Sequence, residues 1–588
     1  MYDRAPAKSM SMETVSRETA GATARFVPAG FRGVLTLRRA IAAAAVLAAI
    51  MAVYFIRHEG WASNVIFTMA ITAMLVAGLA LVSRRILFPT AIIFALVTVV
   101  VIAATVKYEY IGMVLHAYDV VFYMMSLDTL WYLWIDFRKE LIALVLVMIG
   151  VGALGTALYR ADPTRISRRA AALVLAALTV VALVCDHIRG QRPHTLFYWD
   201  DLFVSSFYSS WAETAVTFWR GQMIEASAHA DMQKPFAEPS SCPLAQRPPH
   251  IILIHQESVV PPAIFPTIAY DKSLDPLFQS GDGTMRKLRV ETFGGASWLT
   301  EFSVLAGVST YSFGGMRTFV QSMMQGKVRD SVPQTLSRCG YTNVLFYPVP
   351  KHFVSSGKFY ASIGIEEIND FKAQKSKRYN ERDKFYYGNA LDRFEKHVAA
   401  TKAPLFTYIL TSATHLPYTE PHSPEMKVPG GGPGTEPQLN EYLRRLSIAR
   451  IDLDWFRTEL KRRFPGEKFL IVQYGDHQPI VTRALLGYDD GQEAHNIVMT
   501  PDSKGFLTYY AAEGINYAVP PLPDVEVLDV PYLGTLMLKL AGLPLSQAGL
   551  ERLRLMERCG GAYYLCPHQQ EILAFHRRLI DSGLLVAR

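Results

Sequence analysis

The sequence predicts an N-terminal α-helical bundle of about five transmembrane helices, followed by an α/β domain with a mostly parallel central sheet. The chain has 588 residues, of which 50% are hydrophobic and only 19% are charged, so it is more apolar than a typical soluble protein. Its long uncharged runs lie in the first third. After about residue 240, short β-rich runs alternate with amphipathic stretches, a pattern typical of a parallel sheet covered by helices.

The uncharged runs near the N-terminus are long enough to cross a membrane, since a helix needs about 20 apolar residues to span the hydrocarbon core. We expect a cytoplasmic basic N-terminus over residues 1–39 and a transmembrane domain over residues 40–186. The first run follows nearly forty mostly polar residues, so it is expected to remain as an anchor instead of being cleaved as a signal peptide. The five expected spans are 40–55, 62–81, 86–106, 141–158 and 170–184.

Arginines set the expected orientation of these spans. They precede the first span, follow the second and lie between the fourth and fifth; they are Arg32, Arg38, Arg39, Arg84, Arg85, Arg160, Arg165, Arg168 and Arg169. The positive-inside rule makes these segments cytoplasmic, and an odd number of spans then places the C-terminal domain outside the bacterial cytoplasmic (inner) membrane. These arginines also account for part of the formal charge of +7, so no nucleic-acid partner is expected.

Residues 187–249 are expected to form a juxtamembrane helical connector and a proline-rich linker to the outer domain over residues 250–588. The connector carries an aromatic stretch that includes Trp199, Trp211 and Trp219. A second aromatic stretch, residues 108–139, lies between the third and fourth spans. Aromatic side chains favour the headgroup level of a membrane, although ordinary packing between domains would explain both stretches equally well.

Four of the five cysteines offer candidate disulfides for an oxidising compartment. Cys559 and Cys566 flank a short Gly-Gly segment and would close a small loop. Cys242 and Cys339 form a possible second pair, with two free thiols as the alternative.

Acidic and histidine residues follow two of the apolar runs in the outer domain. The run 251–254 leads to Glu257, and the run 469–472 leads to Asp476 and His477. Ligands of open α/β sheets gather beyond the carboxyl ends of the strands. Carboxylate oxygens and an imidazole nitrogen are ligands for zinc or manganese, whereas an isolated acid at a strand end is usually only solvated. The joint appearance of the two groups predicts a site for one divalent metal ion.

The segment 294–302 adds a hydroxyl group in a position suited to a nucleophile. Two glycines allow a tight turn, and the apolar spacing that follows predicts a helix beginning near Ser297. The N-terminus of a helix favours an anion, which helps an ionised hydroxyl and a phosphate bound to it. The alternative is that Ser297 only caps the helix.

The order of Glu257, a Gly-rich turn with a hydroxyl residue, and a late Gly475-Asp476-His477 is similar to the lipoteichoic acid synthase and phosphoglycerol transferase branch of the sulfatase-like (alkaline phosphatase) superfamily. The resemblance covers about residues 250–545. It implies that Glu257, Ser297, Asp476 and His477 surround one Mn²⁺ or Zn²⁺. It also makes Ser297, where this branch usually carries Thr, the nucleophile, with Thr300 as a second hydroxyl beside it.

The resemblance also gives expectations for substrate binding. His415, in Thr414-His415-Leu416-Pro417-Tyr418, looks like the substrate-side histidine of the family, which would bind a phosphate oxygen or protonate a leaving group. Where lipoteichoic acid synthases carry a Trp and an Arg, this chain has Lys351, His352 and Lys358. A cationic role survives, but Lys lacks the bidentate geometry of Arg, so the head group is left open.

By this resemblance we expect a transferase that moves phosphoglycerol from phosphatidylglycerol to an extracytoplasmic glycan or glycolipid through a phospho-serine intermediate. Three alternatives remain: a phosphoethanolamine transferase acting on lipid A or a surface glycan, a phosphodiesterase, and a non-catalytic envelope scaffold. A formylglycine sulfatase is disfavoured, because Leu299 and Glu301 occupy the Pro and Arg positions of its motif.

Overall fold

The computed structural model describes residues 36–59, 62–111, 114–124, 130–131, 134–135, 137–189, 204–220, 223–226, 233–237, 242–243, 246–487 and 499–587. The predicted basic N-terminus up to residue 35, with Arg32, lies outside the described residues, as does Trp199 of the predicted connector. The chain divides into two compact units. The first comprises Met1–Ile102 and Lys139–Gly190, and the second comprises Ala103–Arg138 and Gln191–Arg588.

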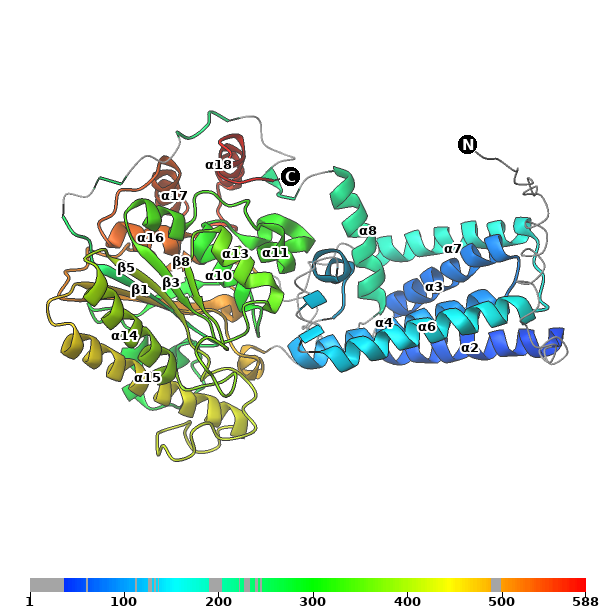
Figure 1. The fold of residues 1–588 in the computed structure, drawn as a ribbon, viewed down its shortest axis with the longest axis horizontal. Helices are drawn as coiled ribbons and strands as arrows, with labels where there is room; N and C mark the ends of the chain where they lie inside the picture. Colours follow the sequence, from blue (N-terminus) through cyan, green and yellow to red (C-terminus); the bar gives the residue numbers. More distant parts are fainter. Residues whose placement is uncertain are drawn as a thin grey trace, which may run out of the picture. The chain divides into compact units, whose positions relative to one another are not determined.

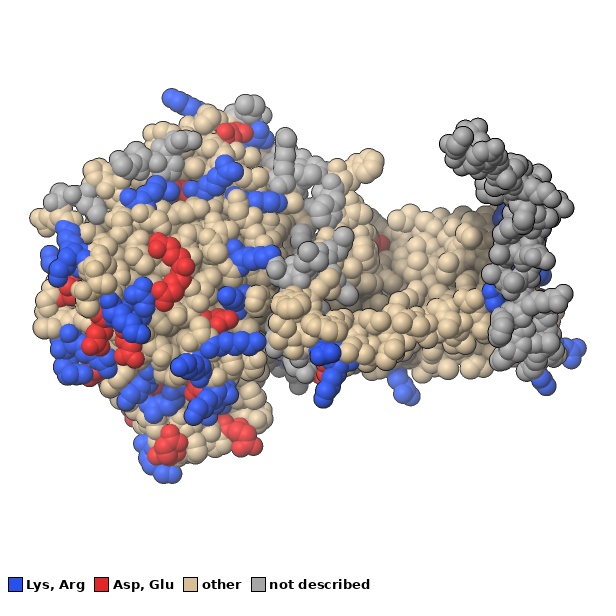
Figure 2. Space-filling view, viewed as in Figure 1, with Lys and Arg blue, Asp and Glu red and all other residues tan. Residues whose placement is uncertain are grey.

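The first unit is built from long apolar helices (Figure 1). Five helices among the described residues are long and apolar enough to cross a membrane, which confirms the predicted number of spans. Their visible surface is predominantly uncharged (Figure 2). Each helix begins before or ends after the predicted apolar run, because helical geometry continues through the polar flanks. The helices are α2 (Leu37–His58), α3 (Ala62–Ser83), α4 (Leu87–Ile111), α6 (Arg138–Ala161) and α7 (Arg168–Arg189).

The start of α4 is held by side chains of the loop that precedes α7. Asp162 accepts the Phe88 backbone N–H at 2.9 Å, and the Thr164 hydroxyl accepts that of Ile86 at 2.8 Å. The Thr164 hydroxyl itself donates to Asp162 at 2.6 Å. Because backbone groups near a membrane core are costly to leave unpaired, these bonds fix where the span begins.

The second unit contains an eight-stranded sheet with the order β4-β3-β5-β1-β6-β7-β2-β8. Five of the seven strand pairings are parallel, and only β7 runs antiparallel to both of its neighbours. The predicted α/β domain with a mostly parallel sheet is therefore confirmed. The strands are β1 (His250–Gln256), β2 (Arg286–Arg289), β3 (Thr342–Phe346), β4 (Glu367–Asn369), β5 (Leu405–Leu410), β6 (Phe469–Gly475), β7 (Leu507–Ile515) and β8 (Val527–Asp529).

Helices cover both faces of this sheet, and the alternation of side chains along β1 divides the core into two layers (Figure 1). Ile251 and Leu253 pack in one layer with α10 (Ser297–Ala306), α12 (Val332–Arg338) and α16 (Leu533–Leu540). Ile252 and Ile254 pack in the other with α14 (Asp383–Ala400) and α15 (Pro437–Arg463). By the same alternation, position 255 belongs to the layer of α10. The other α-helices described in the unit are α8 (Val204–Arg220), α11 (Val320–Met323), α13 (Ser356–Ser362), α17 (Gln547–Arg558) and α18 (Gln569–Asp581).

Residues 103–138 cluster with the outer domain, which differs from the predicted boundary that kept them in the transmembrane domain. Specific contacts explain this. Lys107 pairs with Asp119 at 2.8 Å, and the rings of Tyr118 and Phe319 lie 5.4 Å apart. Helix α8 occupies the predicted connector.

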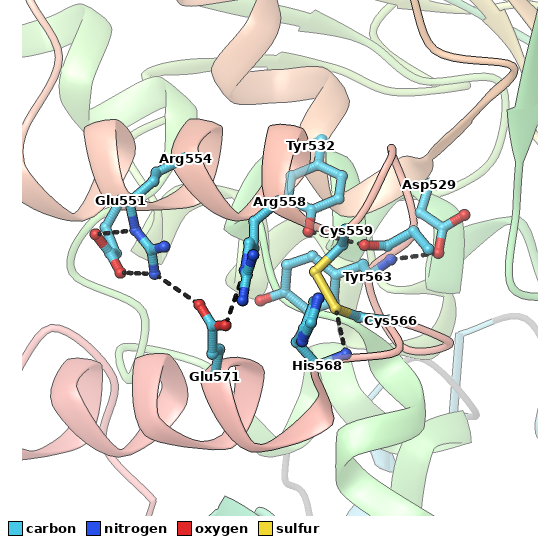
Figure 3. The surroundings of a disulfide bond; sticks show 11 residues. Asp529, Tyr532, Glu551, Arg554, Arg558, Cys559, Tyr563, Cys566, His568 and Glu571 are labelled. Atoms are coloured by element: carbon cyan, nitrogen blue, oxygen red, sulfur yellow. Dashed lines mark hydrogen bonds and ion pairs between the residues drawn. A yellow bond between two sulfur atoms is a disulfide. The ribbon is translucent and has the colours of Figure 1, made fainter.

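Both candidate disulfides are formed. Cys242–Cys339 ties the linker to the end of α12, and Cys559–Cys566 closes the turn between α17 and α18. Figure 3 shows that ion pairs reinforce the second bond: Glu571 of α18 pairs with Arg554 and Arg558 of α17 at 3.1 and 3.2 Å. The C-terminal helices are thus joined both covalently and electrostatically.

Removing the two disulfides should destabilise the outer domain unequally. Cys242 and Cys339 are 97 positions apart, against seven for Cys559 and Cys566. In the chain-entropy description a loop of about 100 residues contributes about 4.7 kcal/mol and one shorter than 15 residues less than about 3 kcal/mol. We expect the Cys242→Ser/Cys339→Ser variant to unfold at a lower temperature than Cys559→Ser/Cys566→Ser, measured by thermal unfolding in detergent. Cys185→Ser, which removes a thiol outside both pairs, is the control; equal losses in the two double variants would contradict the expectation.

Candidate active site

The parallel pairing of β1 with β6 brings two acidic residues together. The register pairs Gln256 with Gly475, so the next residues, Glu257 and Asp476, leave the sheet side by side. Both are buried. Backbone N–H groups of Ser258 and His477 donate to Asp476 Oδ1 at 2.7 and 2.8 Å, which fixes this carboxylate between the two strand ends.

Glycine is required at the end of β6. A Cβ atom on Gly475 would lie 1.9 Å from the carbonyl oxygen of Val259, a distance that no side chain tolerates. The absence of a side chain therefore lets the turn after β1 pass directly over β6. This close approach is the physical reason for the Gly in the Gly475-Asp476-His477 motif.

The four predicted metal-site residues converge in space. Ser297 Oγ donates to Glu257 Oε2 at 2.8 Å and lies 3.4 Å from His477 Nε2. His477 Nε2 in turn lies 3.2 Å from Glu257 Oε1 and 3.3 Å from Asp476 Oδ2. Side chains that are up to 220 positions apart in the sequence thus meet in one largely buried cluster, although their role as ligands stays a prediction.

Ser297 opens helix α10, as the sequence predicts. The preceding Ala296 adopts a left-handed conformation and offers no side-chain cap to the helix. The turn before it is held by the Gly294 N–H, which donates to the Gln478 carbonyl at 2.9 Å. The first N–H groups of α10 and its positive dipole end therefore stand beside the Ser297 hydroxyl, an arrangement that favours an anion.

Burial opposes charge throughout this cluster, but neighbouring charges outweigh it. Despite burial, the Asp476 and Glu257 carboxylates raise the pKa of His477 to about 9. Despite burial, His477 holds the pKa of Glu257 well below its ordinary value. The cluster is thus an anionic pocket that draws positive charge, whether as protons on imidazoles or as a metal cation.

His255 is a member of this site that the sequence reasoning missed. Its Nε2 lies 3.1 Å from Asp476 Oδ2, and both atoms are buried without a hydrogen-bond partner among the described residues. One ligand atom from each of His255, Glu257 and Asp476 lies within 4.8 Å of the others. This buried group offers nitrogen and oxygen donors for a divalent metal ion, and its two orphaned atoms fit such an ion.

The other ring nitrogen of His255 is also engaged. Nδ1 lies 3.0 Å from the hydroxyl of Tyr474, which is 2.7 Å from that of Tyr408. Hydrogen bonding at Nδ1 orients the ring so that Nε2 points at Asp476. The available signal in the sequence was spacing, because side chains two positions apart in an extended chain point to the same side, and Glu257 directly follows β1.

His415 lies in the loop after β5 and is exposed. Arg445 of α15, whose side chain is fully buried, forms hydrogen bonds to the backbone of this loop. Its guanidinium donates to the carbonyl of His415 at 2.7 Å, of Pro417 at 2.8 Å and of Glu420 at 3.1 Å, and its Nε donates to Glu441 at 2.8 Å. Arg445 therefore fixes the position of the His415 loop.

The remaining predicted residues occupy two different settings. Lys351, His352 and Lys358 are exposed, in and just after a loop whose Phe353 packs against Trp298, with ring centroids 6.1 Å apart. Thr300 is fully buried, and its hydroxyl donates to the Asp476 carbonyl at 2.8 Å. The substrate-binding role predicted for His415, Lys351, His352 and Thr300 stays a prediction; Thr300 has an internal partner.

Replacing Arg445 should loosen the His415 loop. Arg445→Lys keeps the charge but cannot reach several carbonyl groups at once, so it leaves partly buried acceptors unpaired, each at a cost of at most about 1–3 kcal/mol. We expect faster amide hydrogen exchange in residues 413–420 and a lower unfolding midpoint. The matched control is Arg462→Lys on the same helix, an exposed residue paired only within its own helix. Unchanged exchange in the loop would show that Arg445 does not hold it.

Comparisons with known proteins agree with this fold. Residues 290–501 match the family model described as Sulfatase. An uncharacterized protein of Haemophilus influenzae is 24% identical over 312 residues, which are 50% of this chain and 51% of that protein. The chain thus spans about half the length of this relative.

Two solved structures are similar to the chain. The Streptococcus pyogenes phosphoglycerol transferase GacH, in complex with sn-glycerol-1-phosphate, is 15% identical at a TM-score of 0.45; the match covers 64% of this chain and 93% of that one. The lipooligosaccharide phosphoethanolamine transferase A (EptA) of Neisseria meningitidis is 12% identical at a TM-score of 0.44, with 85% and 96% covered. The second unit contains a sulfatase-like domain, and the predicted resemblance to the sulfatase-like superfamily is confirmed.

Proposed function

We propose that a sulfatase-like domain anchored by five membrane spans acts here as a metal-dependent transferase. In this proposal it moves phosphoglycerol from phosphatidylglycerol to an extracytoplasmic glycan or glycolipid. The observation that carries the proposal is the position of Ser297. Its hydroxyl begins α10, donates to Glu257 at 2.8 Å and borders a buried cluster of acidic and histidine residues. A hydroxyl in that setting is suited to attack phosphorus.

The residues present fit one divalent metal ion. Glu257, Asp476 and His477, with Ser297 beside them, form the set that the sequence indicated, and His255 adds a second imidazole. When bound, Zn²⁺ or Mn²⁺ would supply positive charge that stabilises an ionised hydroxyl and the negative charge that develops on the phosphoryl oxygens. Both metals accept this mixed nitrogen and oxygen set.

In the first step, Ser297 Oγ forms a bond to the phosphorus of the donor, and the bond from phosphorus to the diacylglycerol oxygen breaks. Glu257, which stays ionised because its pKa is held low, accepts the hydrogen bond of the Ser297 hydroxyl and orients it; the hydroxyl proton passes to water as the bond to phosphorus forms. The leaving oxygen needs a proton, and in this proposal His415, an exposed residue in the loop after β5, donates it. The products of this step are diacylglycerol and a phosphoglyceryl ester of Ser297.

In the second step, a hydroxyl group of the acceptor attacks the same phosphorus, and the bond to Ser297 Oγ breaks. The acceptor proton passes to His415, which lost its proton in the first step, and Ser297 recovers its own proton. The first N–H groups of α10 face the phosphoryl oxygens throughout. Positioning and electrostatic stabilisation thus carry both steps.

Two observations support an extracytoplasmic site with a lipid donor. The outer unit carries two disulfides, which persist in oxidising compartments. Arginines precede the first span, follow the second and lie between the fourth and fifth, which are the cytoplasmic segments by the positive-inside rule. This pattern favours a C-terminal domain outside the inner membrane. Tethering keeps the enzyme in the surface that contains phosphatidylglycerol.

Ser297→Ala should abolish release of diacylglycerol from phosphatidylglycerol vesicles, with a loss of at least about 10³-fold, because the nucleophile is gone. The matched control is Ser362→Ala, whose hydroxyl donates only to the Phe359 carbonyl. Thr300→Val tests the second hydroxyl and should retain the covalent step.

Mass spectrometry of the trapped peptide containing residues 297–300 identifies the modified hydroxyl and the group attached to it. A phosphoglyceryl adduct on Ser297 is expected. A phosphoethanolamine adduct would change the donor, and an adduct on Thr300 would change the nucleophile. Product formed only as free glycerol phosphate, with glycan acceptors present, would make the enzyme a phosphodiesterase.

Metal content tests the cluster independently of activity. We expect about one Zn or Mn per purified chain and a loss of at least about 10-fold in metal affinity for Glu257→Gln and for His255→Gln, measured by elemental analysis and competition with a chelator. His422→Gln, which changes a buried histidine bonded to the Asn380 carbonyl, is the control. Wild-type metal content in both cluster variants would remove these residues from the site.

A further inference from the structure

Helix α8 presents an apolar stripe to its surroundings. The exposed residues follow the spacing i, i+1, i+4, i+5 and i+8, which places them on one face of a helix. Trp211 is 43% exposed, Val216 49% and Trp219 91%. The stripe consists of Trp211, Ala212, Ala215, Val216 and Trp219.

The opposite face of α8 is polar and buried. Ser206, Ser210 and Thr214 recur every four residues on that face, and each is almost fully covered. Ser210 Oγ accepts the Ala117 backbone N–H at 2.8 Å, while the Thr214 hydroxyl donates to the Ser210 carbonyl at 2.6 Å. A helix on a water-exposed surface has the reverse arrangement, with its polar face outward.

The segment that contacts the polar face of α8 is connected by a few residues to the end of a membrane span. Ala117 follows the end of α4 at Ile111 by six residues, which reach at most about 20 Å. Lys107 of α4 holds the segment closer to the end of the helix, because its ammonium group donates to the Val114 carbonyl and to Asp119, both at 2.8 Å. The polar face of α8 thus rests on a segment that begins where a membrane span ends.

Two further exposed tryptophans of the second unit also lie next to a membrane span in the sequence. Trp131 and Trp134 are exposed just before α6, and the guanidinium of Arg138 lies 4.8 Å from the Trp134 ring centroid. The other described tryptophans of this unit, Trp298 and Trp455, are not exposed. Tryptophan at such positions is typical of the headgroup level of a membrane, where its ring is apolar and its N–H remains hydrated.

We propose that α8 is an interfacial helix that lies in the membrane surface, with the stripe from Trp211 to Trp219 in the lipid. The partner is a phospholipid bilayer, because α8 follows the span α7 along the chain and its polar face contacts the segment that follows the span α4. This inference stands without the proposed function.

The contacts of α8 would carry a consequence for the active site. Next to Ala117, the ring of Tyr118 packs on Phe319, and the neighbouring Thr318 carbonyl accepts the indole N–H of Trp298 at 2.8 Å. Trp298 follows Ser297 directly. An α8 held in the interface would therefore fix the height of Ser297 above the lipid, within one compact unit.

The test places a fluorophore on a single cysteine in the full chain. Trp219→Cys and Val216→Cys, each in a Cys185→Ser background, are labelled and reconstituted into vesicles of phosphatidylethanolamine and phosphatidylglycerol. Leu550→Cys, on α17 and also strongly exposed, is the matched control. Spin-labelled lipids quench probes in the interface, and iodide quenches probes in water; an unchanged thermal unfolding midpoint verifies that each variant is folded.

We expect lipid quenching at positions 216 and 219 to exceed that at position 550 by at least about threefold, and iodide quenching to show the reverse order. Iodide quenching at 216 and 219 equal to that at 550 would place the stripe in water and overturn the proposal. Protection from both quenchers that disappears when the protein is diluted into excess lipid would also overturn it, because a second copy of the chain would then cover the stripe.

Discussion

Two buried carboxylates side by side are the constraint on which the rest of the site depends. The β1–β6 register places Glu257 against Asp476, and both are almost fully removed from water. An unpaired buried charge costs several kcal/mol, and two like charges cost more. The surrounding residues compensate the buried negative charge: His255 and His477 bring positive charge, and backbone N–H groups donate to Asp476 Oδ1. A divalent cation would satisfy the same demand with two charges at one point.

Local signals account for what the sequence predicted correctly. Span length and hydropathy are properties of contiguous residues, so the sequence predicts all five long apolar helices of the described residues. Strand ends and a Gly turn singled out Glu257, Asp476, His477 and Ser297, which the structure brings together, while their roles stay predictions. His255 was missed because a histidine inside a strand run reads as part of the strand. Arg445 carried no local signal at all. Its function depends on α15 packing against a loop about 30 positions away, which only the folded chain reveals.

The aromatic stretches show why two readings remained open from sequence alone. From the sequence, the segment 108–139 was consistent both with a membrane interface and with packing between domains. In the structure, one part of it is packed and another part is exposed. Tyr118 packs against Phe319 inside the outer unit, whereas Trp131 and Trp134 are exposed. Composition gives the same signal for both, because an aromatic ring suits a protein core and a membrane interface alike. The distinction lies in which face of each segment the fold covers.

The sheet order separates the buried cluster from the exposed residues that the sequence predicts to bind substrate. Strands β3, β5, β1 and β6 are neighbours, so the loops at their carboxyl ends stand in one row. Glu257 and Asp476 follow β1 and β6, His415 follows β5, and Lys351 follows β3. Because neighbouring strands are about 4.8 Å apart, the end of β3 lies about 10 Å from that of β1 and about 14 Å from that of β6. The buried end of the row is fixed by register and by Gly475, so substitutions in the exposed loops after β3 and β5 are not expected to disturb the buried cluster.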